Sequence, residues 1–312
     1  MLIKDQLYAL QSLEYEPDRF IKWILQNPVK FNLEKKKKLV YTGKAKTLLF
    51  ISALIPLVLV IIMRTSVIWV LAALAAYLLA PWLYLIPALL IIKLYEIPNR
   101  IKTIREARNI LSGNPNLTVI GITGSYGKTT VKEMLKTVLA KKYKVLSTPK
   151  SFNTLFGISQ VIKEQLKPEH EIFIVEMGAY KIGEIAELCR MVKPKIGILT
   201  GITNQHLERF GSEENIIKAK YELIESLPIS GLAVINIDSI PCRDIYSKTK
   251  LSKVGYSRDG QADISATGVS TSILVNMPLI KFGVIVNSST LRSAEVLNGL
   301  ELKVPGEHNV SN

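Results

Sequence analysis

The chain has 312 residues, of which 48% are hydrophobic, and 40 Lys and Arg against 26 Asp and Glu give a formal net charge of +14. This hydrophobic share together with a positive mean hydropathy is high for a soluble protein and indicates contact with lipid. The charge excess is +9 in residues 1–112 and +5 in residues 113–312, where no basic stripe interleaved with aromatic residues occurs, which argues against a nucleic-acid-binding protein.

Residues 1–46 form a polar, basic segment, with helical patterning at 18–25 and a run of four lysines at 35–38. Two uncharged apolar runs follow, at 48–63 and 67–92. A membrane-spanning helix needs about 20 apolar residues, so these runs predict a two-helix transmembrane hairpin over 47–92. The alternative is a pair of buried core helices in a soluble protein.

The basic residues around the two runs predict the orientation of the hairpin. Ten Lys and Arg precede the first run and five lie between residues 93 and 108, whereas only Arg64 separates the runs. Since basic loops stay on the cytoplasmic side, both ends of the hairpin are expected there, in the cytoplasmic membrane. Residues 93–112 are then a juxtamembrane linker. No small-residue cleavage site follows a short apolar region, so a removable signal peptide is not expected.

From residue 113 onward, short apolar strands alternate with helical stretches. The expected strands lie at 117–123, 144–148, 171–177, 195–200 and 232–238. The expected helices lie at 128–140, 155–165, 181–190 and 214–226. This alternation predicts the α/β class, with a parallel sheet covered by helices on both faces. Beyond residue 250 the pattern is rich in strands and turns, and we expect a small β insertion rather than a further α/β unit.

Cys189 and Cys242 are the only cysteines, with no CxxC pair and no Cys/His spacing typical of a metal site. A disulfide framework is therefore not expected, and a reduced, cytosolic compartment is the simpler interpretation.

The stretch "GITGSYGKTT" at 121–130 lies between an expected strand and an expected helix. Such a loop offers backbone N–H groups and the positive end of a helix to an anion. The strict P-loop pattern requires glycine at the position of Ile122, so this is a variant of that loop. The loop predicts a phosphate-binding site, in which Lys128 reaches the phosphates and Thr129 binds Mg²⁺. The residues expected at this site, which the family resemblance given below implies to be an ATP site, are Gly124, Ser125, Gly127, Lys128, Thr129 and Thr130.

Four stretches in order resemble the Mur ligase family, and together they cover about residues 110–312. They are the loop at 121–130, residues 172–200, which are similar to the D-alanyl-D-alanine-adding branch, and residues 205–223 and 306–312. The resemblance implies ATP-dependent amide formation through an acyl phosphate, by addition of D-Ala-D-Ala or a similar amine to a muramoyl-peptide precursor of the cell wall. It implies a Mur ligase central domain over 113–312.

The resemblance also implies two Mg²⁺ ions. Thr129 and Glu176 are expected to bind one, and His206 and Lys220, the latter as a carbamate, the other. Lys128, His206 and Lys220 are then the expected catalytic residues. Each has a simpler alternative: Glu176 as a surface acid, His206 as a polar bystander, and Lys220 as a solvated lysine on an exposed helix position that tolerates alanine.

Two further groups of residues follow from the same resemblance. Asn153 and Thr154 match part of the substrate loop of the family, and for Asn153 a simple helix cap is the alternative. His308, Asn309 and Asn312 match the adenine motif, because an Asn side chain both donates to and accepts from adenine.

The sequence departs from the family at three places. The usual amino-terminal domain is replaced by the polar segment and the hairpin. Gly201 occupies a position where the family often has asparagine. The chain ends within the adenine motif, so we expect a fragment or one half of a split enzyme, with the missing carboxy-terminal domain supplied by a longer chain or a partner. A related amide ligase, polyglutamate-adding or amidating, and a catalytically silent ATP-binding membrane scaffold remain alternatives.

Overall fold

The computed structural model describes residues 3–26, 39–63, 66–149, 152–203, 207–258, 262–274, 277–287 and 295–302. The chain divides into two compact units, residues 1–101 and 102–312, and each is described by itself.

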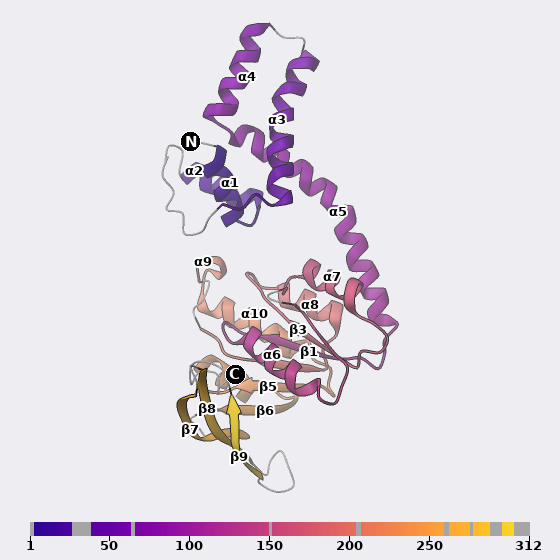
Figure 1. Cartoon of the computed structure of the whole chain (residues 1–312), viewed down its shortest axis with the longest axis vertical. Helices are drawn as coiled ribbons and strands as arrows, with labels where there is room; N and C mark the ends of the chain where they lie inside the picture. Colours follow the sequence, from indigo (N-terminus) through magenta and orange to yellow (C-terminus); the bar gives the residue numbers. More distant parts are fainter. Residues whose placement is uncertain are drawn as a thin grey trace. The chain divides into compact units, whose positions relative to one another are not determined.

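The first unit is helical (Figure 1). Its elements are α1 (Ile3–Ser12), α2 (Pro17–Gln26), α3 (Gly43–Met63), α4 (Val67–Leu79) and the first part of α5 (Trp82–Ser112). One apolar core joins α1 and α2 to α3 and α5 through buried side chains such as Leu10, Phe20, Leu48 and Leu89. The ion pair between Lys44 and Glu96, at 2.9 Å, links α3 to α5 at the edge of that core.

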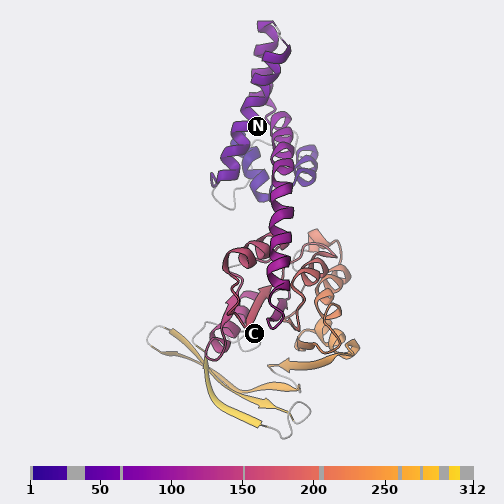
Figure 2. The same cartoon turned by 90° about the vertical axis from the view of Figure 1, so that its right-hand side faces the viewer.

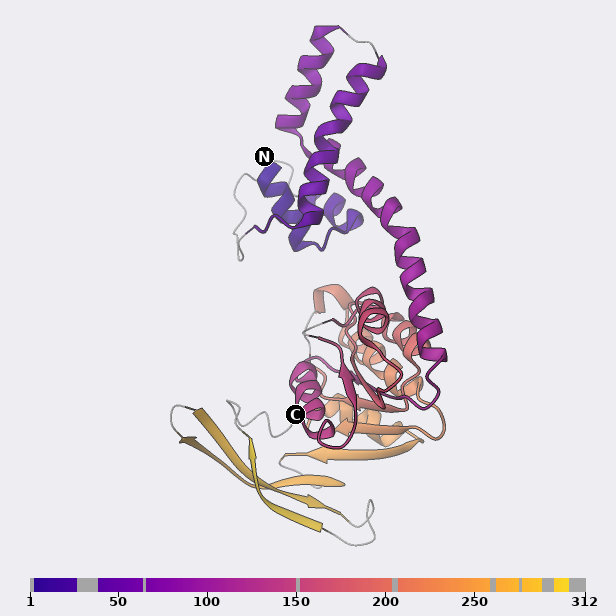
Figure 3. The ribbon, with the colours of Figure 1, turned by 45° about the vertical axis from the view of Figure 1, so that its right-hand side comes forward.

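The second apolar run, 67–92, does not form one helix. It breaks between α4 and α5, whose axes differ by 82°. Pro81 lies at the break; proline has no N–H for a helical hydrogen bond, and it disfavours helical backbone at Ala80 before it. By length and composition, α3 alone among the described helices could cross a membrane, and α4 with α5 would count only as one bent span. Figures 1 and 3 show α3 and α4 side by side as a hairpin.

The second unit is built on one sheet, with strand order β2-β3-β1-β4-β5-β6-β7-β8-β9. The first six strands pair in parallel. They are β1 (Thr118–Thr123), β2 (Val145–Ser147), β3 (Ile172–Glu176), β4 (Ile196–Leu199), β5 (Leu232–Asn236) and β6 (Ser252–Ser257). The first five confirm the strands expected from the sequence.

Helices cover both faces of this sheet, as predicted. They are α6 (Lys128–Leu139), α7 (Leu155–Gln165), α8 (Glu184–Val192), α9 (Leu207–Phe210), α10 (Glu213–Glu225) and α11 (Ile240–Lys248). Successive residues of a strand face opposite sides of the sheet. On one side, Ile122 of β1 lies in the same apolar cluster as Val131 of α6. On the other side, Phe173 of β3 lies in the core that α7, α8, α10 and α11 share. Burial on both faces explains why the strands are almost uniformly apolar.

The end of the sheet differs from the expectation. Helix α11 connects β5 to β6, and these two strands pair in parallel, so the three elements form one more α/β unit. The expectation that residues beyond 250 form only a β insertion is therefore wrong for β6. The β-rich region is β7 (Ile264–Leu274), β8 (Met277–Val286) and β9 (Glu295–Leu302). These strands pair antiparallel and continue the sheet beyond β6, as a ribbon that extends from the rest of the second unit in Figure 2. The linker expected at 93–112 is helical, as part of α5.

Candidate functional site

The glycine-rich loop joins the carboxyl end of β1 to the first turn of α6. Gly124 and Gly127 have φ angles of +151° and +77°, which L-residues with a side chain rarely adopt. A Cβ added at Gly124 would also collide with Thr200 Oγ1. The two glycines therefore allow the sharp reversal that turns the backbone of the loop toward the start of the helix.

The loop is tied to the segment that follows β4. The N–H of Ser125 donates to the carbonyl of Gly201 at 2.7 Å, and the hydroxyl of Thr200 donates to the carbonyl of Tyr126. The side chain of Asn236, at the end of β5, donates to the carbonyl of Thr200 at 2.8 Å. The ends of three neighbouring strands thus hold the loop in position.

Lys128 lies across this loop. Its Nζ donates to the carbonyls of Gly124 at 2.9 Å and Ser125 at 3.3 Å. Burial lowers the pKa of Lys128, and the negative charge of Glu176 opposes that shift. A cation is therefore present beside the loop, where a phosphate would need one.

Glu176 ends β3 beside the loop and is only 2% exposed. Its Oε2 accepts a hydrogen bond from Thr129 Oγ1 at 2.9 Å and from Lys132 Nζ at 3.2 Å. The backbone N–H of Glu176 donates to Thr148 Oγ1 at 3.1 Å. The structure thus brings together Thr129 and Glu176, the two residues expected to bind one Mg²⁺, and the interpretation of Glu176 as a surface acid is wrong.

The donor atoms at this position suit a magnesium ion. A hydroxyl and a carboxylate are hard oxygen ligands, of the kind that Mg²⁺ binds together with water and phosphate oxygens. Among the described residues, no group of three or more His, Cys, Asp or Glu could hold a metal by itself. Phosphate oxygens or water would therefore complete the coordination. His206, expected at the second ion, lies outside the described residues.

Lys220 is buried, with 5% of its surface exposed. It lies on α10, and its Nζ is 5.8 Å from the centroid of the Phe210 ring. Burial, with a smaller contribution from the charge of Lys128, lowers the pKa of Lys220 to about 8, against the opposing charges of Glu184 and Glu222. The interpretation of Lys220 as a solvated lysine at an exposed position is therefore wrong.

Comparison with known proteins agrees with this geometry. Residues 122–312, more than half of the chain, match the family Mur ligase middle domain. The chain belongs to the Mur ligase family. The resemblance seen in the four sequence motifs is thus confirmed, and the α/β fold with its loop is that of a Mur ligase middle domain.

Individual relatives point to one branch of the family. This Mur ligase is 34% identical over 196 residues to the UDP-N-acetylmuramoyl-tripeptide–D-alanyl-D-alanine ligase of Mycobacterium bovis, which covers 63% of this chain and 36% of that protein. Its structure is similar to that of MurF from Acinetobacter baumannii, with a TM-score of 0.59 and 27% identity. The similar region covers 68% of this chain and 44% of that protein. MurF from Thermotoga maritima, solved in complex with ADP, gives a TM-score of 0.56 at 26% identity, with coverage of 68% and 46%. The chain spans less than half the length of each of these three proteins.

The remaining expected residues of this Mur ligase have different outcomes. Thr154 is the N-cap of α7, where its Oγ1 accepts from the N–H of Gly157 at 3.3 Å, so the cap position is not Asn153, for which a helix cap was the alternative. Asn153 lies beside the end of β3, since its carbonyl accepts from the N–H of Gly178 at 3.2 Å. His308, Asn309 and Asn312 lie outside the described residues.

Three residues at this edge of the Mur ligase were not predicted from the sequence. Lys132 pairs with Glu176, and Thr148 fixes the backbone of Glu176. Glu222 accepts from the N–H groups of Gly183 at 2.6 Å and Ala186 at 2.9 Å, at the start of α8. For Lys132 a sequence signal existed, because it follows Thr129 by three residues and so lies on the same face of a helix.

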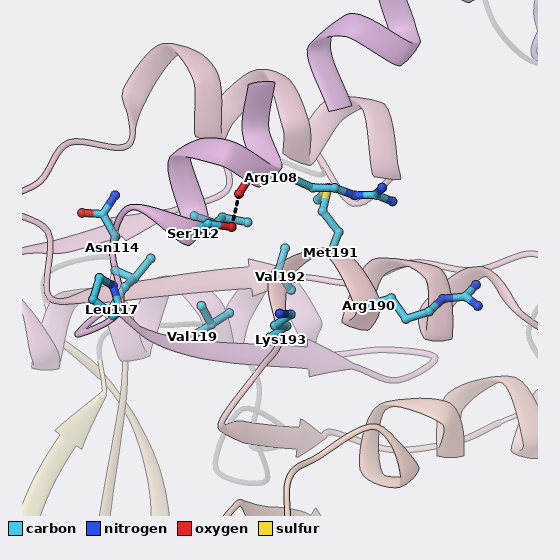
Figure 4. Close-up of a pocket in the computed structure, with 11 residues that line it drawn as sticks. Arg108, Ser112, Asn114, Leu117, Val119, Arg190, Met191, Val192 and Lys193 are labelled. Atoms are coloured by element: carbon cyan, nitrogen blue, oxygen red, sulfur yellow. Dashed lines mark hydrogen bonds between the residues drawn. The ribbon is translucent and has the colours of Figure 1, made fainter. Parts of the chain in front are cut away.

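A separate pocket of about 650 Å³ lies where the end of α5, the start of β1 and the end of α8 meet (Figure 4). Leu117, Val119 and Met191 contribute apolar surface, and Arg108, Arg190 and Lys193 contribute charge. Its β1 residues are at the amino-terminal half of that strand, whereas the phosphate loop follows the carboxyl end. This pocket is therefore not part of the candidate active site of the Mur ligase.

Proposed function

We propose that this chain is the nucleotide-binding part of an ATP-dependent ligase that adds D-alanyl-D-alanine, or a similar amine, to a muramoyl-peptide precursor of the cell wall. The observation that carries the proposal is the contact of 2.9 Å between the Thr129 hydroxyl and the buried Glu176 carboxylate, directly after a glycine-rich loop. The names of the similar proteins supply the substrate class.

Two displacements make up the proposed reaction. A carboxylate oxygen of the muramoyl peptide attacks the γ-phosphorus of ATP, and the bond from that phosphorus to the bridging oxygen of ADP breaks. The amine nitrogen then attacks the acyl carbon of the resulting acyl phosphate, inorganic phosphate leaves, and the nitrogen loses a proton. Lys128 and the N–H groups of the loop would hold the phosphates in line.

Thr129 and Glu176 would hold Mg²⁺ beside the phosphates of ATP. When bound, the ion offsets the negative charge that otherwise keeps a carboxylate from a phosphate. The proposed second site consists of His206 and carbamylated Lys220. Lys220 is buried near the positive charge of Lys128, so an ammonium there is unfavourable. The neutral amine attacks the carbon of CO₂ and loses a proton, and the carbamate anion that forms suits both Lys128 and a metal ion.

Phosphate release tests the proposed reaction, with residues 1–312 assayed together with the carboxy-terminal domain that we expect a longer chain or a partner to supply. It is measured with ATP, Mg²⁺, UDP-muramoyl tripeptide and D-Ala-D-Ala, leaving out each in turn. We expect release only when all are present, and a loss of at least about a hundredfold in Lys128→Met, because that cation contacts the transferring phosphoryl group. Lys136→Met, which removes an exposed lysine from the same helix, is the matched control.

Three results would contradict the assignment. Release that needs neither the carboxylate nor the amine would indicate a simple ATPase. Release with folylglutamate and glutamate, but not with the muramoyl peptide, would indicate the polyglutamate-adding alternative. ATP binding without turnover under every combination would indicate the silent scaffold.

The carbamate has its own test. Lys220→Ala should abolish ligation, and added acetate or another small carboxylate should restore part of it by supplying an anion in the vacated space. Lys218→Ala, two residues earlier on α10 and exposed, is the control. Full activity of Lys220→Ala at low CO₂ would rule out the second metal site, while the site at Thr129 and Glu176 would stand.

We also propose that the first unit anchors this ligase in the cytoplasmic membrane. The apolar span within α3, Gly43–Ile62, has a mean hydropathy of 2.5, and only 17% of it is buried within the chain. No residue of α4 is buried, and Ile68, Leu71 and Leu78 are each more than 60% exposed. So much exposed apolar surface is unfavourable in water and suits a lipid environment.

A further inference from the structure

Lys132 is a fully buried cation for which the proposed phosphate chemistry has no use. It lies one turn after Lys128 on α6, and its exposed fraction is 0%. Its Nζ is 3.2 Å from Oε2 of Glu176, which is itself 2% exposed, and 3.6 Å from a carboxylate oxygen of the exposed Glu133. A lysine is almost never buried this completely unless its charge is compensated.

The position of Lys132 follows from the spacing on α6. Thr129 and Lys132 are three residues apart, so both side chains lie on the same face of the helix. Both donate to the same carboxylate oxygen, Oε2 of Glu176, at 2.9 and 3.2 Å. The described hydrogen bonds of the carboxylate thus converge on one oxygen.

A buried carboxylate without a counter-charge is strongly destabilising. A divalent ion bound to Glu176 would supply that charge, and without the ion the ammonium of Lys132 supplies it. The two cations are adjacent to the same carboxylate and therefore repel each other. Lys132 can accordingly hold Glu176 in place before the ion binds and weaken the binding of the ion at the same time.

We propose that Lys132 is a positioning residue of the metal site: an internal counter-cation that orients the Glu176 carboxylate through Oε2 and lowers the affinity of the site for a divalent ion. The proposal rests on the proposed function in one respect, namely that Glu176 binds the ion. Lys132 itself does not contact the reacting atoms.

Binding of Mn²⁺ alone to the chain in detergent micelles, measured by electron paramagnetic resonance, is the principal experiment. Lys132→Met should bind Mn²⁺ at least about fivefold more tightly than the unsubstituted chain, because one repelling charge is gone. In thermal unfolding, the same variant should have a lower Tm without metal and a larger increase in Tm with saturating MnCl₂. Lys136→Met, with the same change of charge at an exposed position of α6, should leave both quantities unchanged.

A purely structural role for Lys132 would give a different result. Lys132→Met would then lose the same number of degrees with and without Mn²⁺, at unchanged Mn²⁺ affinity, and this result would overturn the proposal. If Lys132→Met does not fold, Glu176→Gln is compared with the double variant Lys132→Met/Glu176→Gln. A higher metal-free Tm in the double variant supports the pairing of the two charges, and an equal or lower one overturns it.

Glu176→Gln separates this proposal from the proposed function. If Glu176→Gln binds Mn²⁺ as the unsubstituted chain does, Glu176 is not a ligand, and the metal assignment fails along with the role of Lys132. If Glu176→Gln loses the Mn²⁺ site while Lys132→Met leaves its affinity unchanged, the metal assignment stands and only the role of Lys132 is refuted.

Discussion

Gly201 and Tyr126 compete for the same space: a Cβ added at Gly201 would lie 2.5 Å from Oη and 2.6 Å from Cζ of Tyr126. Tyr126 belongs to the phosphate loop, and Gly201 follows β4. A side chain at residue 201 would require the Tyr126 ring to move, so the two positions are sterically coupled. The φ angle of Gly201, +159°, independently disfavours a side chain there.

This coupling predicts the outcome of a double substitution. Gly201→Asn should displace Tyr126 and the loop attached to it, and overpacking of this kind costs about 1–3 kcal/mol. We expect ATP affinity, measured by titration calorimetry, to fall by about tenfold or more. Gly201→Asn combined with Tyr126→Ala should recover the part of the affinity that the clash removes, but not the part due to the positive φ of residue 201, whereas Tyr126→Ala alone should change it little. A double variant as weak as Gly201→Asn would show that another contact is responsible.

Glu222 should contribute to stability through the start of α8. Its carboxylate accepts from two backbone N–H groups there, and it is 7% exposed. Glu222→Gln leaves one of these N–H groups facing an amide NH₂, which costs about 1–3 kcal/mol for a buried donor. We expect Tm to fall by roughly 3–8 °C. Glu225→Gln, an exposed position on the same helix, should leave Tm within about 1 °C of the unsubstituted protein. An equal loss in both variants would contradict this capping role.

The buried Lys220 predicts a dependence of stability on pH. In CO₂-free buffer its pKa is about 8 in the folded chain, below the ordinary value of 10.5, so between these values the unfolded chain binds more protons. Stability from this residue therefore increases as pH rises through that window, and below it the buried ammonium costs about 3 kcal/mol. Lys220→Met lacks this cost. It should be more stable than the unsubstituted chain at pH 7, by a margin that shrinks by pH 10, as measured by thermal unfolding; a constant margin would mean that the ammonium is not penalised.

The anchor predicts a specific topology. Reporter domains fused after Met63 and after Arg108 should report opposite sides of the membrane. The basic residues lie before the first apolar run and after the second, whereas the segment between the two runs has only Arg64. A fusion after Lys46 should report the same side as the fusion after Arg108. A chain that stays soluble without detergent, or three fusions that all report one side, would refute the two-span hairpin.

The strands, the main helices and the phosphate loop of the second unit were predictable from local sequence. The apolar run 172–175, between Glu171 and Glu176, for example, needs only the alternation of side chains between two buried faces to be recognised as a central strand. The loop at 121–130 needs only the conformational freedom of glycine and the place of Lys128 at a helix start. These signals depend on neighbours in sequence.

Burial and charge pairing depend on residues that are far apart in the chain, and the sequence did not reveal them. Lys132 and Glu176 are separated by 44 positions, and the spacing of Lys132 from Thr129 indicates only a shared helix face, not the buried ion pair. Lys220 reads as a solvated lysine among charged neighbours, yet it is buried once α10 packs on the sheet, and the charge of Lys128 then reaches it. In both cases the deciding quantity is the free energy of a charge in its surroundings, and those surroundings exist only after distant segments have packed together.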